Sequence, residues 1–532
     1  MTDQHLHFTT KDNKTWARET FGFEAVAACM SHEAEGMNHF YIGTSIKFAS
    51  PVNGSALKTP VTNAWTRLRY WAPVVGTRTI PKEGAHNVYL ITYAPPASAA
   101  EASQWAAETI KWDETEAPLT VRDDAIKEAW WTPSQNHYSA EMHVGPAGDG
   151  LWSFILATGH WSSDARGTIP LVDKFFEFLA AELDGSATPP VEQISWGQEV
   201  AKLAPTGAQA VKLSAEKTDA VAEKVESNLS GAQAKGPAPP DAPQPPPLFG
   251  RPKGLTAGNG EDASTQPKSL TQRIVLTAEE TAALTKVSKA HGATITETVN
   301  TILVLAEIES ILRTAAQDEA KFAEVKASYD AAGIYPLALT TFSRRNFLAP
   351  EYANHDAPKG CPSFAFEGFP IMHNMTNLRK CIKINGTSID IVPEFFWTGA
   401  VADNVAELEK LKKSGTPESY VASQTATNAV IPIFTPAMFP NPALVTTSTG
   451  SLKKLGMLTR WEPSAGGPLA VQKILLSLRA TSLFPYNTVT FWEWDGQLNL
   501  SAHAASDHLG TGDFALLEEG VRKWVAAAIS TQ

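Results

Sequence analysis

Cysteine is scarce in this sequence, which has only Cys29, Cys361 and Cys381 among its 532 residues. The number is odd and the three lie far apart, so the sequence indicates neither a disulfide framework nor a zinc site of closely spaced cysteines. This usage is typical of a reducing compartment, and we therefore expect a cytoplasmic protein.

Long apolar runs and an excess of positive charge are also missing. The polar start "MTDQHLHFTTKDNK" has no apolar core of a signal peptide, and no segment approaches the length of an uninterrupted membrane span. Acidic residues outnumber basic ones by 56 to 44, which gives a formal net charge of -12. We therefore expect a soluble protein without a membrane span and without general affinity for nucleic acid.

Hydrophobic residues make up 43% of the chain, enough for two sizeable cores. Between Phe21 and about Trp196, strand-like stretches such as "FYIGTSIKF" alternate with helical patterns. The stretch "ALKTPVTNAWTRLRYW" predicts an amphipathic helix with Pro60 in its first turn. The runs "HYSAEMHVG" and "GLWSFILAT" flank "PAGDG", which predicts an antiparallel hairpin.

A proline-rich stretch interrupts these patterns, with eight prolines between Gly236 and Pro252. We interpret it as an extended or disordered tether outside any core, or as a ligand of SH3-type domains. Order is expected to resume near Ser269, with helices beginning at Thr277 and Thr294. The predicted division is an N-terminal lobe over 1–204, an Ala/Pro-rich linker over 205–268, disordered in part, and a C-terminal lobe over 269–532.

The stretch "FILATGHWSSDARG" brings a histidine to the end of a predicted strand, with Asp164 four residues after His160. A neutral imidazole is well suited to take a proton from a hydroxyl at cellular pH. Histidine and aspartate at this spacing are also common in purely structural settings. The stretch "LNLSAHAASDHLGTG" repeats the pattern with His503 and Asp507, which predicts equivalent corners of two related lobes, unless the repeat arose by chance.

Six stretches in order along the chain resemble a known family: "GHWSSDARG", "WGQEVAKLAP", "RIVLTAEETAALTKVSKAHGATITETVNTIL", "TTFSRRNFL", "TTSTGSLKKLG" and "LNLSAHAASDHL". Together they resemble the chloramphenicol acetyltransferase-like superfamily of CoA-dependent acyltransferases, which includes plant BAHD enzymes and condensation domains. The resemblance is closest to fungal enzymes of the trichothecene 15-O-acetyltransferase type. It implies an α/β (α+β) fold of two related lobes, each a mixed sheet flanked by helices, with an active-site tunnel between them.

The resemblance also implies roles for particular residues. His160 would be the general base, and Asp164 would form a structural salt bridge with an arginine of the second lobe. Arg345 is the best match for that arginine, while Arg344 and Arg166 remain alternatives. Two features depart from the family pattern: Ala165 and Arg166 separate Asp164 from the following glycine, and the plant-type Asp-Phe-Gly-Trp-Gly motif is absent.

The remaining predicted site residues lie in the second lobe. Thr447, Ser448 and Ser501 are unranked candidates for a hydroxyl that meets the oxyanion or the acceptor. His503 is expected to line the acceptor site without exchanging protons. Lys453 and Lys454 lie in a turn that could meet CoA phosphates, but a solvated loop is the favoured interpretation.

The implied activity is transfer of an acyl group, acetyl first of all, from acyl-CoA to a hydroxyl of a small secondary metabolite. A terpenoid alcohol is the leading acceptor, with no covalent intermediate, no metal and no nucleotide-binding loop. One alternative is a condensation-type enzyme whose donor is a carrier-protein thioester. Another is a binding protein of the same fold without catalysis. We expect a monomer whose partners are the acyl donor and the alcohol.

Overall fold

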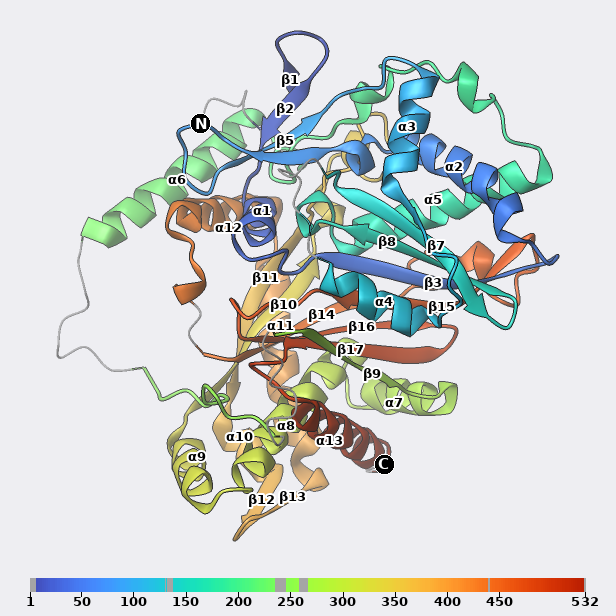
Figure 1. The fold of residues 1–532 in the computed structure, drawn as a ribbon. Helices are drawn as coiled ribbons and strands as arrows, with labels where there is room; N and C mark the ends of the chain where they lie inside the picture. Colours follow the sequence, from blue (N-terminus) through green and yellow to red (C-terminus); the bar gives the residue numbers. More distant parts are fainter. Residues whose placement is uncertain are drawn as a thin grey trace.

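Two mixed sheets with helices on their outer faces form the upper and lower parts of the protein (Figure 1). The structure is a computed structural model and describes residues 6–129, 131, 137–234, 245–257, 267–438 and 441–530. The predicted α/β class is confirmed, since mixed sheets flanked by helices make up both lobes.

The upper, N-terminal lobe is built on a five-stranded sheet of order β15-β3-β8-β7-β6. Its strands are β3 (Phe40–Phe48), β6 (Ile110–Trp112), β7 (Ala140–Gly148), β8 (Leu151–Thr158) and β15 (Leu469–Leu478). The predicted hairpin is confirmed, because β7 and β8 pair antiparallel. Along β3, the alternate side chains of Phe40, Ile42 and Ile46 pack into the lobe's core.

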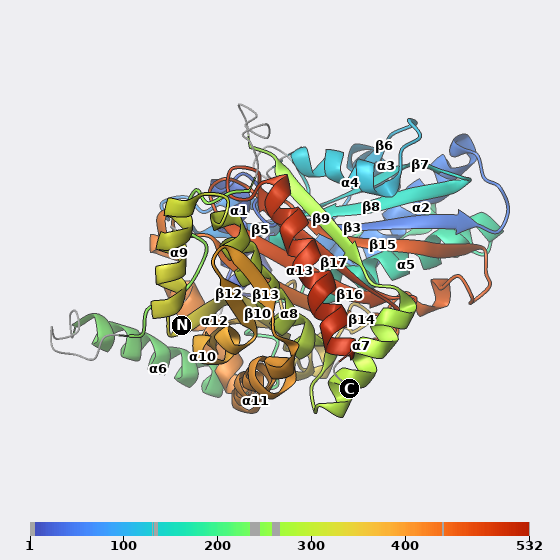
Figure 2. The ribbon, with the colours of Figure 1, turned by 90° about the horizontal axis from the view of Figure 1, so that it is seen from below.

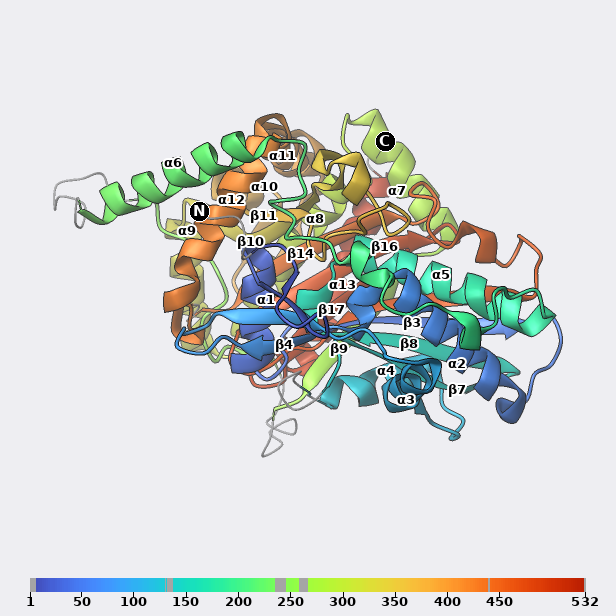
Figure 3. The same ribbon diagram turned by 90° about the horizontal axis from the view of Figure 1, so that it is seen from above.

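Three helices cover this core, as the view from above shows (Figure 3). They are α2 (Gly54–Trp71), α3 (Ala99–Thr109) and α5 (Ala165–Asp184). The helix α2 starts earlier than predicted, because the Asn53 side chain accepts a hydrogen bond from the backbone N–H of Ala56 and caps it. Pro60 therefore lies inside the helix, and the prediction of a first-turn position is wrong.

The smaller elements of this part surround the main sheet. A four-stranded sheet of order β1-β2-β5-β4 and the helices α1 and α4 lie beside it. Their bounds are β1 (Thr9–Thr10), β2 (Trp16–Glu19), β4 (Arg78–Pro81), β5 (Tyr89–Tyr93), α1 (Phe23–Glu33) and α4 (Leu119–Glu128).

The lower, C-terminal lobe contains a six-stranded sheet of order β11-β10-β14-β16-β17-β9. Strands β10, β14 and β16 run parallel, and the others pair antiparallel. The bounds are β9 (Ser269–Val275), β10 (Ile334–Ser343), β11 (Phe366–Asn374), β14 (Ala443–Ser451), β16 (Tyr486–Trp494) and β17 (Gln497–Ala505).

Helices α7 (Ala278–Ala290), α8 (Ile295–Ala315) and α13 (Thr511–Ser530) cover one face of this sheet (Figure 2). The predicted starts of α7 and α8 are confirmed. Thr277 with Glu280 and Thr294 with Glu297 each form a reciprocal capping box, in which both backbone N–H groups are satisfied.

The other described elements of the lower lobe lie at its edges. The strands β12 (Ile382–Asn385) and β13 (Ser388–Ile391) form a separate pair. The helices are α9 (Glu319–Ala331), α10 (Met375–Lys380), α11 (Ala402–Ser414) and α12 (Pro417–Val430).

One strand from the C-terminal part of the chain belongs to the sheet of the N-terminal lobe. The strand β15 comes late in the sequence, yet it pairs antiparallel with β3 over its whole length, from Leu469 opposite Phe48 to Leu478 opposite Phe40. Trp492 and Trp494 of β16 also pack into the upper core. The residue ranges predicted for the lobes remain a prediction, and the structure adds that their cores share this late part of the chain.

Part of the stretch predicted as a linker is folded. The helix α6 (Ala215–Ala234) packs beside α12 and projects from the left side of Figure 1. Residues 235–244 of the proline-rich stretch lie outside the described residues. Further on, Phe249 is only 1% exposed and belongs to the lower core, so the expectation that this stretch contributes no core residue is wrong at its C-terminal end.

Arg251 anchors this end of the linker in the lower lobe. Its guanidinium donates to Glu307 Oε1 at 3.1 Å, to Asp513 Oδ1 at 2.8 Å and to Ser310 Oγ at 3.0 Å. All three charged side chains are buried. Since a buried charge needs a partner, this network explains why a proline-rich stretch ends in an ordered segment.

We expect Arg251→Met to lower the free energy of unfolding by about 3 kcal/mol, because the substitution leaves two buried carboxylates without their guanidinium. Urea unfolding followed by fluorescence measures the change. Lys253→Met is the matched control, since Lys253 is exposed and lies on the same segment. Equal urea midpoints for the two variants would show that the Arg251 network contributes nothing.

Candidate active site

His160 lies in the short connection between β8 and α5. The strand ends at Thr158, a 3-10 turn spans His160–Ser162, and α5 begins at Ala165. Asp164 is the N-cap of α5, because its Oδ1 accepts a 2.8 Å hydrogen bond from the backbone N–H of Gly167. The predicted motif therefore consists of a histidine in a turn and an aspartate that begins the next helix.

The hydrogen bond of His160 defines its tautomer. Its Nδ1 lies 3.0 Å from the carbonyl oxygen of Ser163. A carbonyl oxygen can only accept, so Nδ1 carries the hydrogen and Nε2 of the neutral ring has a free lone pair. Since Nε2 has no hydrogen-bond partner among the described residues, it is available as a base.

Aromatic rings flank the His160 imidazole on two sides. The ring centroid of Phe364 lies 5.2 Å away, and that of Phe40 lies 6.0 Å away in a stacked arrangement. Burial lowers the pKa of His160 below 6.5, although the Ser163 carbonyl and the charge of Asp164 oppose this shift. His160 is therefore neutral at pH 7.

Asp164 does not contact the imidazole but connects the two lobes. Its Oδ1 lies 2.7 Å from Nη2 of Arg345, which follows β10, and its Oδ2 accepts from the backbone N–H of Ala365 at 3.1 Å. Burial alone would raise the pKa of Asp164, but Arg345 and the two backbone donors outweigh it and hold the pKa below 3.8. The pair is thus charged at neutral pH.

The partners of Arg344 and Arg166 show that neither of these two arginines pairs with Asp164. Arg344 forms an ion pair with Glu367, and Arg166 donates to the carbonyl oxygen of Thr449 at 3.1 Å. Arg345 also donates through Nη1 to the Cys361 sulfur at 2.7 Å. The predicted partner of Asp164 is therefore the arginine that lies beside it.

The ends of two parallel strands of the lower sheet meet the start of α5. Strand β10 runs into Arg345, which holds Asp164, and Thr449 near the end of β14 accepts from Arg166. In mixed and parallel sheets, ligands bind beyond the carboxyl ends of such strands. His160 therefore lies near the start of α5, close to residues at the ends of β10 and β14, so both lobes contribute residues to this region.

The register of the lower sheet distinguishes the three candidate hydroxyls. Thr447 pairs with Thr490, and Thr490 pairs with Ser501, so these three side chains share one face. The same face of β16 carries Trp492 and Trp494, which pack into the upper lobe's core. Thr447 and Ser501 therefore face the upper lobe.

Ser448 lies on the opposite face of the sheet. It pairs with Phe491, a residue of the lower core, and its Oγ lies 3.1 Å from the hydroxyl of Thr296 at the start of α8. The structure therefore does not bring Ser448 together with Thr447 and Ser501.

The second histidine motif has a different local structure. His503 lies inside β17, not at its end, and Asp507 lies in the turn that follows. The helix α13 begins at Thr511, and the side chain that accepts from the preceding Gly510 N–H is that of Asp513. The prediction of equivalent corners is wrong, because Asp164 caps its helix and Asp507 does not.

Sequence reasoning missed the segment that precedes β11. It supplies Cys361, the Ser363 carbonyl that accepts from the Asp164 N–H at 3.0 Å, Phe364 and the Ala365 N–H. Two of these contacts use backbone atoms, for which side-chain identity gives no signal. The isolated position of Cys361 in the sequence indicated neither a disulfide nor a zinc site and gave no sign of its contact with Arg345.

A hollow lies next to this segment. Cys361 and Ser363 line it together with Trp71, Lys202 and His355, and His160 is not among its lining residues. His355 approaches α5 through a 2.9 Å hydrogen bond to the carbonyl oxygen of Gly167. The hollow thus borders the residues that hold Asp164.

Two further predictions concern charged residues and membranes. Lys453 pairs with Glu462 at 3.0 Å, and Lys454 is exposed. In the part of the chain that the structure describes, none of the helices is both long and apolar enough to cross a membrane, and the three cysteines are free and buried. Across the same residues there is no group of three potential metal-ligating side chains.

Solved structures share this fold over nearly the whole chain. The first condensation domain of the calcium-dependent antibiotic synthetase aligns with a TM-score of 0.55 at 13% identity, covering 96% of both chains. Polyketide synthase associated protein 5 from Mycobacterium tuberculosis aligns with a TM-score of 0.53 at 13% identity, covering 96% of this chain and 97% of its own. The chain therefore has the condensation-domain fold.

A more specific similarity points to one kind of acetyltransferase. The structure of TRI3 trichothecene 15-O-acetyltransferase from Fusarium sporotrichioides aligns with a TM-score of 0.73 at 16% identity, covering 99% of this chain and 98% of its own. Residues 2–245, a little under half of the chain, match the sequence model of the family described as 15-O-acetyltransferase Tri3. No curated protein sequence matches significantly. The predicted resemblance to enzymes of the trichothecene 15-O-acetyltransferase type is confirmed.

Proposed function

We propose that this protein transfers an acyl group, acetyl first of all, from acyl-CoA to a hydroxyl of a small secondary metabolite. A terpenoid alcohol of the trichothecene type is the first acceptor to test, because the similar enzyme from Fusarium sporotrichioides is a trichothecene 15-O-acetyltransferase. The observation that carries the proposal is the bare Nε2 of a neutral histidine where the two lobes meet.

In the proposed mechanism, His160 Nε2 takes the hydroxyl proton as the alcohol oxygen attacks the thioester carbonyl. The tetrahedral intermediate then collapses, the C–S bond breaks, and the departing thiolate takes the proton from the imidazolium. The Ser163 carbonyl keeps hydrogen on Nδ1 throughout and so holds the ring orientation. Transfer is direct, with no covalent enzyme intermediate.

Asp164 and Arg345 would act as structural residues in this mechanism. Their ion pair fixes the start of α5 relative to the end of β10 and thereby places the turn that carries His160. For the hydroxyl that meets the oxyanion, we favour Thr447 and Ser501 over Ser448, because the first two face the upper lobe.

The test is acyl transfer from a panel of acyl-CoA donors to a panel of terpenoid alcohols, with release of free thiol as the readout. Thiol release that depends on the alcohol, with formation of the ester, supports the proposal. Release that is equal with and without any alcohol, and unchanged in His160→Ala, would contradict it. The His160→Ala protein serves as the matched control for uncatalysed hydrolysis.

Two rival functions give different results in this assay. A condensation-type enzyme would ignore free acyl-CoA and react only with a thioester on a carrier protein. This possibility follows from the shared fold with condensation domains. A binding protein without catalysis would bind the alcohol in calorimetry and release no thiol from either donor.

The rate of transfer should rise with pH toward a plateau. His160 must be neutral to act as the base, and its burial lowers its pKa below 6.5, so the midpoint of the rise lies below that value. The measurement is kcat/KM for the alcohol from pH 4 to 8, under conditions where chemistry limits the rate, because kcat/KM reports the pKa of the free enzyme. A midpoint above pH 7, or a rate that falls from pH 6 to 8, would contradict the role of His160.

The proposal includes the setting in which the enzyme works. We propose a cytoplasmic monomer that needs no metal, with acyl-CoA as co-substrate and the small alcohol as acceptor. Sedimentation of the purified protein tests whether it is a monomer. Activity in the presence of a chelator tests whether it needs a metal.

A further inference from the structure

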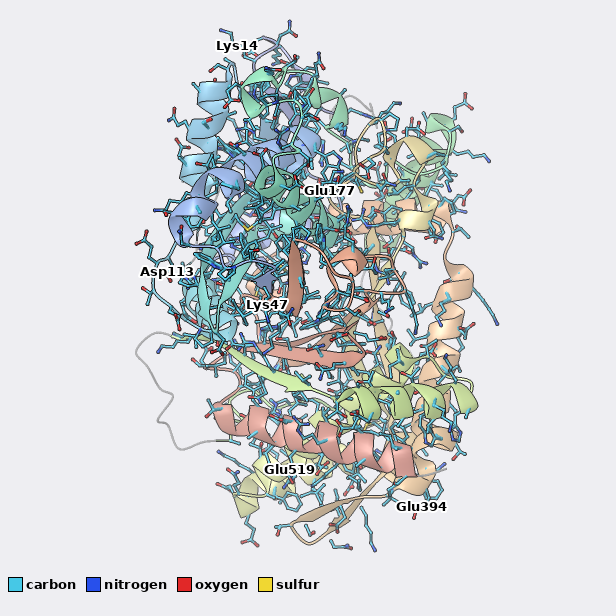
Figure 4. The ribbon with its side chains drawn as sticks, turned by 90° about the vertical axis from the view of Figure 1, so that its right-hand side faces the viewer. Lys14, Lys47, Asp113, Glu177, Glu394 and Glu519 are labelled. Carbon is cyan, nitrogen blue, oxygen red and sulfur yellow. The ribbon has the colours of Figure 1, made fainter. Side chains whose placement is uncertain are left out.

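A group of charged residues, with Lys127 and Asp123 fully buried, lies where α4 of the upper lobe meets β9 and β17 of the lower lobe. Figure 4 shows the two lobes from the side, with Lys47 of β3 above the lower strands and Glu519 of α13 below them. The side chain of Lys127 on α4 is 0% exposed, and its Nζ lies 3.1 Å from Asp123 and 2.8 Å from Asp124.

The charges of this group balance. Arg273 of β9 donates to Asp123 and to Asp124, both at 2.6 Å, and Ser477 of β15 donates to Asp123 at 2.6 Å. Two carboxylates therefore accompany two cations. Lys127 lies between two carboxylates, and the Nζ of a lysine ammonium donates hydrogen bonds and has no lone pair with which to accept one.

Lys127 also contacts a threonine that lies beside His503. Its Nζ donates to the hydroxyl oxygen of Thr271, and that oxygen lies 3.2 Å from Nδ1 of His503. The Thr271 hydroxyl has one hydrogen and two lone pairs, and Lys127 takes one lone pair, so its hydrogen finds an acceptor among these contacts only if Nδ1 of His503 is unprotonated. The contacts therefore favour the tautomer of His503 with its hydrogen on Nε2, the opposite of His160.

The hydrogen on Nε2 of His503 has no partner in the described residues. His503 is 1% exposed, and its Nε2 is buried without a hydrogen bond. Burial and the positive charges of Lys127 and Arg273 hold the pKa of His503 well below its usual range, so the ring stays neutral. A buried donor without a partner is unfavourable and marks a place where a ligand oxygen can bind.

The position of His503 fits such a ligand. It lies two residues from Ser501 on the same strand, so both side chains project from the face that meets the upper lobe. His160 offers a lone pair from one lobe, and His503 offers a hydrogen-bond donor from the other.

We propose that Lys127 and Thr271 are positioning residues that hold His503 as a neutral Nε2–H donor, which binds an oxygen of the acceptor alcohol. This assignment rests on the proposed function, since it names a contact of the same site. It also ranks the two histidines: only His160 exchanges protons, and His503 binds.

The tautomer itself is measured by ¹⁵N NMR of the histidine side chains in the full-length protein, with His503→Gln used to assign the signals. We expect wild-type His503 to be protonated at Nε2. Thr271→Val removes the hydroxyl without changing the shape of the side chain, and it should shift His503 toward the Nδ1–H form or toward a mixture.

Thr488→Val is the matched control. Thr488 flanks His503 on β16, as Thr271 does on β9, and both lie directly opposite it in the sheet. No hydrogen bond joins Thr488 to His503 in the described residues, so this variant should keep the Nε2–H form. Equal spectra for Thr271→Val and Thr488→Val, or a wild-type ring protonated at Nδ1, would overturn the proposal.

Steady-state kinetics test the binding role. We expect His503→Leu and Thr271→Val to raise the KM for the alcohol about threefold to tenfold, with kcat changed less and the KM for acyl-CoA unchanged. His503→Gln keeps a side-chain N–H near the Nε2 position and should recover part of the loss. If His503→Leu leaves the alcohol KM unchanged, the donor does not bind the acceptor.

The two experiments fail independently. If no alcohol is acylated at all, the proposed function fails, while the NMR result still decides whether Lys127 and Thr271 set the tautomer. If the alcohol is acylated but His503 is protonated at Nδ1, the proposed acyltransferase function is supported and the proposed role of His503 as an Nε2–H donor is wrong.

Discussion

His160→Ala should lower kcat by at least about 10²-fold while the protein remains folded, because general base catalysis contributes about 10²–10⁴-fold. His160 lies in a turn, and its side chain makes one hydrogen bond, to a backbone carbonyl, so its removal leaves no buried charge unpaired. The measurements are thiol release under saturating substrates and circular dichroism of the purified variant.

His503→Asn is the control for this experiment, since His503 is the other histidine of a matching motif. It should keep kcat within about tenfold of the wild type and change the alcohol KM, because a binding contact affects the rate less than the base does. Retained turnover in His160→Ala together with lost turnover in His503→Asn would reverse the assignment of the two histidines.

Asp164→Ala and Arg345→Ala should each impair stability and turnover together. Removing one partner of a buried pair leaves the other charge unpaired, at a cost of about 3–5 kcal/mol. The pair joins the start of α5 to the end of β10, so its loss should also displace the turn that carries His160. Urea unfolding and kcat measure the two effects.

A double-mutant cycle distinguishes a specific pair from two separate losses. If Asp164 and Arg345 stabilise the protein through each other, the double variant should lose little more than either single variant. Additive losses would show that Arg345 acts elsewhere, for example through Cys361. Arg344→Ala is the control arginine, since it pairs with Glu367 instead.

The sequence predicted the lobes' secondary structure well wherever periodicity and capping residues were strong. The β7–β8 hairpin and the helix starts at Thr277 and Thr294 are predicted correctly because short-range patterns determine them. Pro60 was misplaced, since a capping asparagine moved the start of α2. The core position of Phe249 was missed because composition alone suggested a tether.

In the candidate site, only the residues that belong to recognisable sequence motifs could be predicted. The pattern of His160 and Asp164 was visible in the sequence, and Arg345 came from the resemblance to a family. The Ser163 carbonyl that sets the tautomer and the Thr271 hydroxyl that contacts His503 gave no signal. Such contacts depend on backbone atoms and on strand register, which short sequence patterns do not specify.

The pairing of β3 with β15 has a consequence for how the protein is made. During synthesis, the N-terminal lobe leaves the ribosome with one edge of β3 unpaired, and this edge stays open until Leu478 has been added opposite Phe40. An open strand edge invites pairing with other chains. We therefore expect the upper lobe to complete its fold only after most of the chain has emerged, which makes nascent chains truncated before β15 prone to aggregation and dependent on chaperones.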